Sequence, residues 1–483
     1  MIKRLMPSAS RALLSIFTFV LIAGSICSTT PAFGQKHKNK GGTKDLGTQG
    51  RQMPVVIRDS LPNGLHILFT RINEIPLAEI SVVVDAGIAL ETNDNHGAAY
   101  GVNQLLLAGS SNRAGDMVSN YLSELGSVVY PFLHYDYAQL YAKTLTRSFS
   151  GTLSVMADAV SAPSLPEQAL LRLKRDASLR LSRQSSSGER ATIIAVQRLC
   201  GDGHVMSRLL QPTAEEVEAL TIEKLRAYHS TWYQPRRTTV IITGNLEYAF
   251  VRTALLETFG RWENRENVKN ISVSAGAIDQ SVVVVSDSTT LSGRAYFRIG
   301  GRAFLRNDDD FPAQMLLNNI LSDGPQSRLQ QTLWSKHLIS PNFSTAVAFS
   351  RDCSYFMISG SASPMLTDSV LLFVQEVIVD IAREGVTEKE LSAAKNALLA
   401  DDALSYGLNR NLQSLLKEMT VYGLSLEQLF SFSANIRAVS SKDIQRVAQT
   451  VLDPNRLQTV VLGSEEKIVR SIRSMGKKVR IVE

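Results

Sequence analysis

The histidines are the first residues to test for chemistry, because two histidines four residues apart on one helix face can hold a metal ion. No two of the seven histidines are three to five residues apart. His96 stands four residues before Tyr100, but the Asn, Asp and Gly residues around it favour a helix cap or loop over a metal ligand. We interpret His134-Tyr135-Asp136-Tyr137 as the polar face of a strand between Val128 and Leu140. The histidine spacing therefore predicts no metal site.

Cysteine and serine chemistry finds equally little support. Cys200 and Cys353 follow the N-terminal segment, and their spacing fits neither a metal cluster nor a CxxC redox motif. A single disulfide and two buried free thiols both remain open for this pair. The run Gly201-Asp202-Gly203-His204 is typical of a surface turn. The chain has no G-x-S-x-G elbow, which disfavours a serine hydrolase.

An internal repeat shows how the chain is organised. Residues 220–227 match residues 439–446, and residues 233–244 match residues 452–463, at one gapless offset (439 − 220 = 219). Each copy starts with Thr or Ser as a helix cap, passes through a helix and a Pro-containing turn, and ends in a β-branched strand that closes on Gly. This agreement favours a duplication over chance similarity.

The beginnings of the two halves agree more loosely. Strands are predicted at 65–70 and 80–87 in the first half, and at 281–286 and 294–300 in the second. A polar run near residue 262 suits a linker. We therefore predict an α+β fold with two homologous α/β sandwich domains, each a sheet packed by helices. The domains span 55–262 and 280–483, and the linker spans 263–279.

The N-terminus predicts export. Residues 1–34 combine three positive charges, an apolar run and small residues before a cleavage point, which is typical of a secretory signal peptide. A retained anchor helix and a lipoprotein at Cys27 are the weaker alternatives. Residues 35–54 are predicted to be a basic, disordered lead-in. Without residues 1–34 the net charge of +6 falls to about +3 (6 − 3), so the basic balance does not predict nucleic-acid binding. We expect the periplasm or cell envelope, and no membrane span in the mature chain.

The segment after the second predicted strand carries a resemblance to a known family. Its signals are Asn63-Gly64-Leu65, a strand ending in Ala86-Gly87, then Glu91, Gly97-Ala98-Ala99 and residues 105–110. This order resembles the N-terminal half of the pitrilysin/insulinase family, which includes the mitochondrial processing peptidases. The resemblance covers about residues 55 to 483, and it implies two similar α+β domains that face each other across a chamber.

The resemblance implies a zinc site that this sequence lacks. Active members carry H-x-x-E-H on a helix, with two zinc-binding histidines and a Glu that takes a proton from metal-bound water. At these positions the chain has Tyr100, Asn103 and Gln104. Near the position of the distal Glu ligand stands Arg180, 76 residues after Gln104 (180 − 104). A guanidinium opposes a cation, so we expect no metal site and no catalytic residues here.

The second half departs from the family pattern as well. Active relatives use an Arg and a Tyr in a segment like S-R-L-x-x-x-L-R-(x)6-Y to hold the substrate carbonyl. Residues 327–333 match the start of this segment, but Trp334 stands at the Arg position and Pro341 at the Tyr position. Three elements of the catalytic apparatus are therefore replaced.

Three interpretations follow from the resemblance. The first is a non-catalytic subunit that binds extended peptide or protein substrate and pairs with an active, zinc-bearing relative as a hetero-oligomer. The second is a stand-alone peptide-binding or structural protein of the envelope. The third is an active metallopeptidase with an atypical site. No cofactor is expected, and zinc is expected only under the third interpretation.

Overall fold

The fold comes from a computed structural model, which describes residues 54–72, 75–181, 187–201, 204–208, 210–265, 282–286, 293–322, 327–332, 343–406, 409–475 and 478–482. These residues belong to one compact unit of the chain, Gly47–Glu483. The expected signal peptide, the lead-in up to residue 53 and residues 266–279 of the expected linker lie outside the described residues, as do Trp334 and Pro341. No helix in the described part of the chain has both the length and the apolar character needed to cross a membrane.

The first sheet has six strands: β1 (Ile57–Ser60), β2 (His66–Arg71), β3 (Leu77–Val84), β4 (Val128–Leu133), β5 (Ala138–Leu145) and β6 (Thr238–Gly244). Their order is β1-β2-β6-β3-β5-β4, with β2 and β6 parallel and all other neighbours antiparallel. Because side chains alternate along a strand, Ile80 and Val82 of β3 enter the main core, whereas Glu79 and Val83 lie on the opposite face.

The second sheet repeats this plan with β7 (Val282–Ser286), β8 (Ala295–Arg302), β9 (Phe343–Phe349), β10 (Ser354–Ala362), β11 (Gln458–Gly463) and β12 (Val479–Val482). The order is β12-β7-β11-β8-β10-β9. Here β7 and β11 are the parallel pair that corresponds to β2 and β6, and β12 adds a second parallel neighbour to β7. The predicted fold class, two sheets packed by helices, is confirmed. The chamber between them stays a prediction.

Helices cover one face of the first sheet: α1 (Ala98–Leu105), α2 (Gly115–Glu124), α3 (Phe149–Ser161), α4 (Glu167–Leu181), α6 (Ala214–Glu218), α7 (Ile222–Trp232) and α8 (Tyr248–Phe259). Short 3-10 helices connect several elements: η1 (Ile88–Leu90), η2 (Asn93–Asn95), η3 (Thr146–Ser148), η4 (Val205–Ser207), η5 (Pro235–Arg237) and η7 (Pro364–Leu366). The apolar sides of the longer helices meet the inward side chains of the strands in one continuous core.

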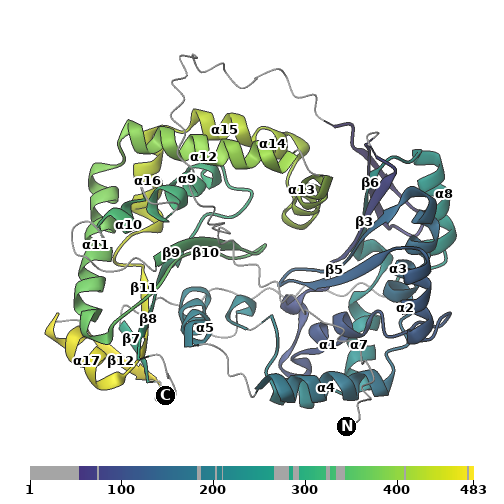
Figure 1. Ribbon diagram of the computed structural model, residues 1–483, viewed down its shortest axis with the longest axis horizontal. Coiled ribbons are helices and arrows are strands. Elements are labelled where there is room, and N and C mark those ends of the chain that lie inside the picture. Colours follow the sequence, from purple (N-terminus) through teal and green to yellow (C-terminus); the bar gives the residue numbers. More distant parts are fainter. Residues whose placement is uncertain are drawn as a thin grey trace, which may run out of the picture. The chain divides into compact units, whose positions relative to one another are not determined.

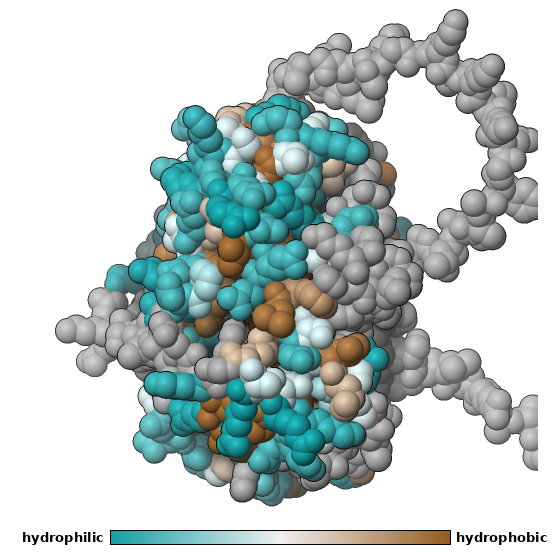
Figure 2. All heavy atoms as spheres, turned by 90° about the vertical axis from the view of Figure 1, so that its left-hand side faces the viewer, coloured by the Kyte–Doolittle hydropathy of each residue, from teal (hydrophilic) through white to brown (hydrophobic). Residues whose placement is uncertain are grey.

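The second sheet has a corresponding helical layer: α9 (Phe311–Ser322), α10 (Arg328–Gln330), α11 (Thr367–Glu384), α12 (Glu388–Tyr406), α14 (Leu426–Phe430), α15 (Phe432–Ala438), α16 (Ser441–Val451) and α17 (Glu465–Ser474). Figure 2 views the molecule from the side on which α11 lies in Figure 1. Hydrophilic residues cover most of the coloured surface there, and the apolar patches between them are small.

The repeat found in the sequence is present in the secondary structure. Helix α7 starts at Ile222 and α16 starts at Ser441, which again gives 219 (441 − 222). Both helices are capped by a hydroxyl, since Thr221 accepts from the backbone N–H of Lys224 and Ser440 from that of Asp443. Each helix then leads into a buried strand, β6 or β11.

Two helices cross to the sheet of the other half. Helix α5 (Ser187–Cys200) packs against β8 and β11 of the second sheet, and α13 (Asn409–Tyr422) packs against β3 and β6 of the first (Figure 1). Gln413 of α13 donates from Nε2 to the backbone oxygen of Glu79, at 2.9 Å. Arg298 of β8 donates to the backbone oxygen of Gly188 in α5, at 2.8 Å. Each crossing helix has its own apolar cluster with the sheet that it covers.

Candidate functional site

Helix α1 carries Tyr100, Asn103 and Gln104, which are predicted to stand at the positions of the zinc motif, and a buried carboxylate caps its first turn. The two carboxylate oxygens of Glu91 accept hydrogen bonds from the backbone N–H groups of Gly97, at 3.1 Å, and Ala99, at 2.8 Å. This is favourable because the N-terminal N–H groups of a helix lack partners within the helix. Burial nevertheless raises the pKa of Glu91 to about 7, and the two backbone hydrogen bonds only partly oppose that rise.

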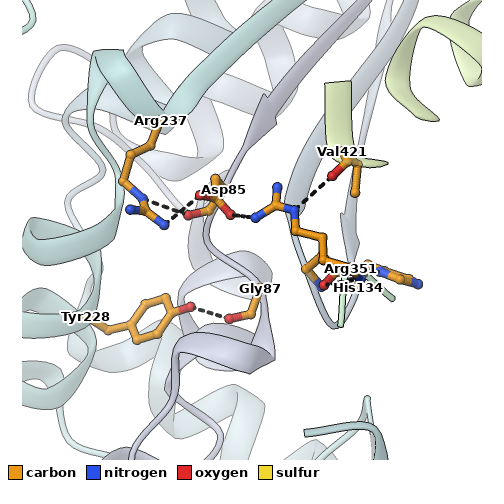
Figure 3. Close-up of polar contacts among 8 residues, drawn as sticks. Asp85, Gly87, His134, Tyr228, Arg237, Arg351 and Val421 are labelled. Carbon is orange, nitrogen blue, oxygen red and sulfur yellow. Dashed lines mark hydrogen bonds and ion pairs between the residues drawn. The ribbon is translucent and has the colours of Figure 1, made fainter. Parts of the chain in front are cut away.

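Close packing fixes α1 against α7. A Cβ atom at Gly101 would stand 2.6 Å from a methyl carbon of Leu225, so glycine allows the two helices to approach here. In the loop before α1, the hydroxyl of the fully buried Tyr228 donates to the backbone oxygen of Gly87, at 2.8 Å (Figure 3). The orientation of α1 is thus set by packing and backbone contacts.

The three motif positions of α1 do not form a metal site. Tyr100 belongs to the main core and is only 6 % exposed. Asn103 is 1 % exposed, and its Nδ2 donates to the backbone oxygen of Phe132 in β4, at 2.9 Å. Gln104 is exposed. A tyrosine packed in the core, an amide that donates to a carbonyl and an exposed amide do not make a zinc-ligand set, so zinc does not fit this arrangement.

Helix α4, on which the distal ligand position is predicted, packs directly against α1. Arg180 is in the last turn of α4. The assignment of Arg180 to the position of the distal ligand stays a prediction from the sequence.

The two histidines near this region have ordinary local roles. His96 ends η2 just before α1, and its Nδ1 lies 3.7 Å from a carboxylate oxygen of Glu216. His134 stacks on Tyr137, with ring centroids 4.9 Å apart. The prediction that residues 134–137 belong to a strand is wrong, because β4 ends at Leu133 and β5 starts at Ala138. These residues form the hairpin turn, whose backbone pairs with Ile88 and Ala89.

Strand β4, the edge of the first sheet next to α1, presents a row of exposed apolar side chains. Val128, Tyr130 and Phe132 are 53 %, 49 % and 42 % exposed. They pair with Lys143, Tyr141 and Gln139 of β5, so they lie on the face opposite the main core. An edge strand with unpaired backbone groups is where an extended peptide can add to a sheet.

The matching segment of the second half has a structural role at its arginine. Arg328 binds both carboxylate oxygens of Glu390, at 2.6 and 2.9 Å, and also donates to the backbone oxygen of Gly385. The arginine holds the pKa of Glu390 down at about 2. Trp334 and Pro341, the positions of the family's substrate-holding residues, lie outside the described part of the chain.

A charge network that sequence reasoning missed joins the two halves at the end of β3 (Figure 3). Asp85, at the end of β3, accepts from Arg237 of its own half at 2.6 Å and also pairs with Arg351 of the second half. Arg351 donates in addition to the backbone oxygen of Val421, at 2.8 Å. Asp85 and Arg351 are 266 residues apart in sequence, so no local pattern could have paired them.

Sequence reasoning also missed a buried cluster under α5. Cys200, His204 and Cys353 have ligand-type atoms that all lie within 4.8 Å of one another. The prediction of a surface turn is wrong for His204, which is buried, and the prediction that the cysteine spacing suits no metal cluster overlooked this proximity. Both thiols are free and buried. The signal in the sequence was the interval of four between Cys200 and His204.

Comparisons with known proteins agree with this architecture. Residues 67–197 match the family model described as insulinase (peptidase family M16), and residues 219–398 match the one described as the peptidase M16 inactive domain. An uncharacterized zinc protease of Streptomyces coelicolor is 22 % identical over 82 % of this chain and 87 % of its own length. A probable mitochondrial-processing peptidase subunit beta of Arabidopsis thaliana is 21 % identical over 84 % of this chain and 77 % of its own.

Solved structures show the same fold. A peptidase M16 inactive domain from Pseudomonas fluorescens has a TM-score of 0.75 and 20 % identity, and covers 85 % of this chain and 98 % of its own. A protease from Helicobacter pylori also has a TM-score of 0.75, with 17 % identity over 85 % of this chain and 99 % of its own. With the two family models matching one after the other along both halves, this chain belongs to peptidase family M16.

Proposed function

We propose that the chain is a non-catalytic M16 subunit that binds extended peptide and pairs with a zinc-bearing relative for proteolysis. The observation that carries this proposal is that the side chains at the motif positions of α1 have structural roles. Tyr100 is packed in the core, and the Nδ2 of Asn103 donates to the carbonyl of Phe132, so neither side chain is free to bind metal or activate water. The helix contributes to the fold and holds the edge of the sheet.

Peptide binding at β4 is supported by the side chains and the position of this strand. The edge lies beside α1, Tyr130 and Phe132 offer large exposed aromatic surfaces, and among the described strands β4 pairs with β5 alone. Main-chain hydrogen bonds would supply affinity for any extended chain, and the aromatic rings would add apolar contact. A substrate without fixed structure fits such a surface best.

Pairing with an active relative is supported by the family. One similar protein is a probable subunit beta of the mitochondrial-processing peptidase. A chain that keeps the two-sheet scaffold but replaces the ligand residues retains surfaces for substrate and partner while lacking the chemistry itself. We further propose that residues 1–34 direct export to the periplasm or cell envelope, as their composition predicts.

Purification of the native chain from cells under mild conditions tests the pairing. We expect a zinc-bearing M16 protein to co-purify, and we expect zinc and peptidase activity to follow that partner. The isolated chain should contain no stoichiometric zinc and cleave no peptide. A single species without a family partner would contradict the pairing. Chelator-sensitive cleavage by the pure chain would overturn the non-catalytic assignment.

A binding assay tests the peptide site independently of the partner. Fluorescence anisotropy with a labelled unfolded peptide should show binding, and the double substitution Tyr130→Glu with Phe132→Glu should weaken it at least about tenfold, since two aromatic contacts are lost. Leu372→Glu is the matched control, because Leu372 is 52 % exposed on α11 of the other half. Equal binding by both variants would place the peptide elsewhere.

The row on β4 also favours the second candidate, a stand-alone peptide-binding protein of the envelope. That reading requires the same edge but no partner. It predicts a monomer from native cells that still captures unfolded peptide. The co-purification experiment therefore separates the two candidates, while the anisotropy assay tests what they share.

An active enzyme with an atypical site is the remaining alternative. The cluster of Cys200, His204 and Cys353 does not support it, because none of the three residues belongs to α1 and the Nδ1 of His204 already accepts from the backbone N–H of Met206. Metal analysis of the pure chain together with a cleavage assay tests this alternative directly.

A further inference from the structure

Two cysteines from opposite halves of the chain meet beneath α5. Cys200 is the last residue of α5 and Cys353 directly precedes β10, and they are 0 % and 6 % exposed. Their sulfur atoms lie 2.7 Å apart. A disulfide bond is about 2.05 Å long, whereas two thiolates on one tetrahedral zinc, each at about 2.3 Å, lie about 3.8 Å apart. The two sulfurs are thus closer to bonding distance than to the separation that a shared metal requires.

Separate networks bring the two cysteines together. Arg298 donates to Thr192 at 2.7 Å and Arg302 donates to the backbone oxygen of Leu199 at 3.2 Å, so arginines of β8 hold α5 over the second sheet. Cys353 is fixed by a turn in which its N–H donates to the hydroxyl of Ser350. The cysteines therefore meet because both backbones are held independently of them.

The third member of the cluster is already engaged. The Nδ1 atom of His204 accepts from the backbone N–H of Met206, at 3.2 Å, so a neutral ring carries its proton on Nε2. Desolvation lowers the pKa of His204, which favours this neutral form. Metal binding through Nε2 would put the proton on Nδ1 and break the bond to Met206. The imidazole therefore lies beside the two sulfurs as a neutral side chain.

The electrostatic surroundings favour thiol chemistry at one cysteine. A hydrogen bond from Cys200 lowers the pKa of Cys353 and burial partly opposes this, while the nearby Arg302 guanidinium lowers the pKa of both thiols. The hydrogen bond between the thiols raises the pKa of Cys200, together with burial. Cys353 is thus the better nucleophile of the two, and Cys200 remains the protonated partner.

We propose that Cys200 and Cys353 form a disulfide that ties α5 of the first half to the second sheet. The oxidant is a disulfide, supplied by an oxidised thiol carrier protein or by oxidised glutathione. The Cys353 thiolate attacks one sulfur of the oxidant and releases its other half as a thiolate. Cys200 then loses its proton and attacks the Cys353 sulfur, which releases the second thiolate. The net change is one protein disulfide formed and one carrier disulfide reduced to two thiols.

A redox titration of the full chain tests this proposal without reference to its location in the cell. The reduced protein is equilibrated in glutathione buffers of rising oxidised fraction, quenched by acid, alkylated under denaturing conditions and digested for mass spectrometry. We expect a linked peptide pair containing Cys200 and Cys353, and a melting temperature a few degrees higher in the oxidised protein. The peptide readout separates this pair from Cys27. Two alkylated thiols at every buffer ratio would overturn the proposal, and so would thiols protected by stoichiometric bound metal.

A second experiment reads out the tie between the halves. A protease site is inserted between residues 266 and 281, the oxidised chain is cut there, and the products are run on a denaturing gel. The two fragments should stay joined without reductant and separate with it. In Cys353→Ser they should separate in both lanes, and its melting temperature should no longer depend on the redox buffer. Fragments of the wild-type chain that separate without reductant would contradict the disulfide.

Discussion

Asn103 shows at the scale of one residue how the motif helix was adapted. In place of the carboxylate of an active relative, it offers an amide N–H to the backbone oxygen of Phe132. Its other amide atom, Oδ1, is buried without a hydrogen-bond partner in the described part of the chain. One good hydrogen bond and one orphaned acceptor make this position sensitive to charge.

Asn103→Asp should therefore destabilise the fold by about 2–4 kcal/mol at pH 7. The change buries a carboxylate and replaces a donor with an acceptor facing a carbonyl. The loss should shrink as the pH falls, because a protonated carboxyl can donate to Phe132 again. Urea unfolding at pH 5 and pH 8 measures both effects. Gln104→Glu, one residue further and exposed, should stay within about 0.5 kcal/mol of the wild type.

Glu91 predicts a pH dependence of stability. Its pKa rises from 4.5 to about 7 on folding, so between these values only the folded chain holds the proton. Unfolding then releases a proton. The contribution of Glu91 to the free energy of unfolding is therefore greatest below pH 4.5, and it falls as the pH rises to about 7. The linkage amounts to roughly 3 kcal/mol across the window.

Glu91→Gln should remove that decline. The free energy of unfolding of the variant, relative to that of the wild type, should rise between pH 4.5 and 7 and stay constant above pH 7. Denaturant unfolding at several pH values measures this difference. The comparison with the wild type is needed because His229 acts in the opposite direction. Burial lowers its pKa to about 4, so its contribution rises with pH over an overlapping range. Parallel pH profiles for the two proteins would refute the assignment.

At the scale of elements, the loop before α1 and the β4–β5 turn approach each other closely at Gly87. A Cβ atom at Gly87 would stand 2.2 Å from the backbone oxygen of Tyr135 and 2.4 Å from the backbone nitrogen of Tyr137. Neither neighbour is a side-chain end that can rotate away. The loop and the turn can therefore approach this closely only with glycine.

Gly87→Ala should lower the free energy of unfolding by about 2–4 kcal/mol, because two backbones must separate. Gly151→Ala in α3 is the contrast. There the nearest atoms are the ends of the Leu125 and Tyr121 side chains, at 2.9 and 3.0 Å, and alanine also favours the helix. That change should cost less than about 1 kcal/mol. Equal losses in thermal or urea unfolding would contradict the backbone argument.

The elements themselves were largely predictable, and their partners were not. Hydroxyl caps and β-branched runs located α7, β6, α16 and β11, because these signals are local. The replaced motif at Tyr100, Asn103 and Gln104 was also readable, and its place on one helix is confirmed. Sequence could not assign α5 to the second sheet, since an amphipathic helix does not specify which apolar surface it covers. For the same reason the burial of His204 was missed.

At the scale of the whole molecule, the ion pair of Asp85 with Arg351 links the halves directly. Asp85 keeps Arg237 as a second partner, so the removal of Arg351 does not leave the Asp85 carboxylate without a counter-charge. Arg351→Ala should therefore cost about 1–2 kcal/mol, as should Asp85→Asn. A double-mutant cycle should give a coupling energy of about 1 kcal/mol, which falls with added salt.

The control for this cycle is Arg446, which pairs with Asp310 inside the second half at an exposed position. Arg446→Ala should change the free energy of unfolding by less than about 1 kcal/mol and show no coupling to Asp85→Asn. Additive effects of Arg351→Ala and Asp85→Asn would mean that the contact contributes nothing to holding the halves together.

The crossing of α5 and α13 has a consequence for how such a chain can be divided. Each half contributes one helix that packs on the sheet of the other half, opposite that sheet's own helical layer. This is the arrangement of a domain-swapped dimer whose two chains are joined into one. A cut between the halves would give two fragments. Each would have a crossing helix without the sheet that it packs on, and a sheet with one face uncovered. Neither fragment should be soluble alone, and the two made together should assemble. The two halves can therefore be made as separate chains, but they fold only together.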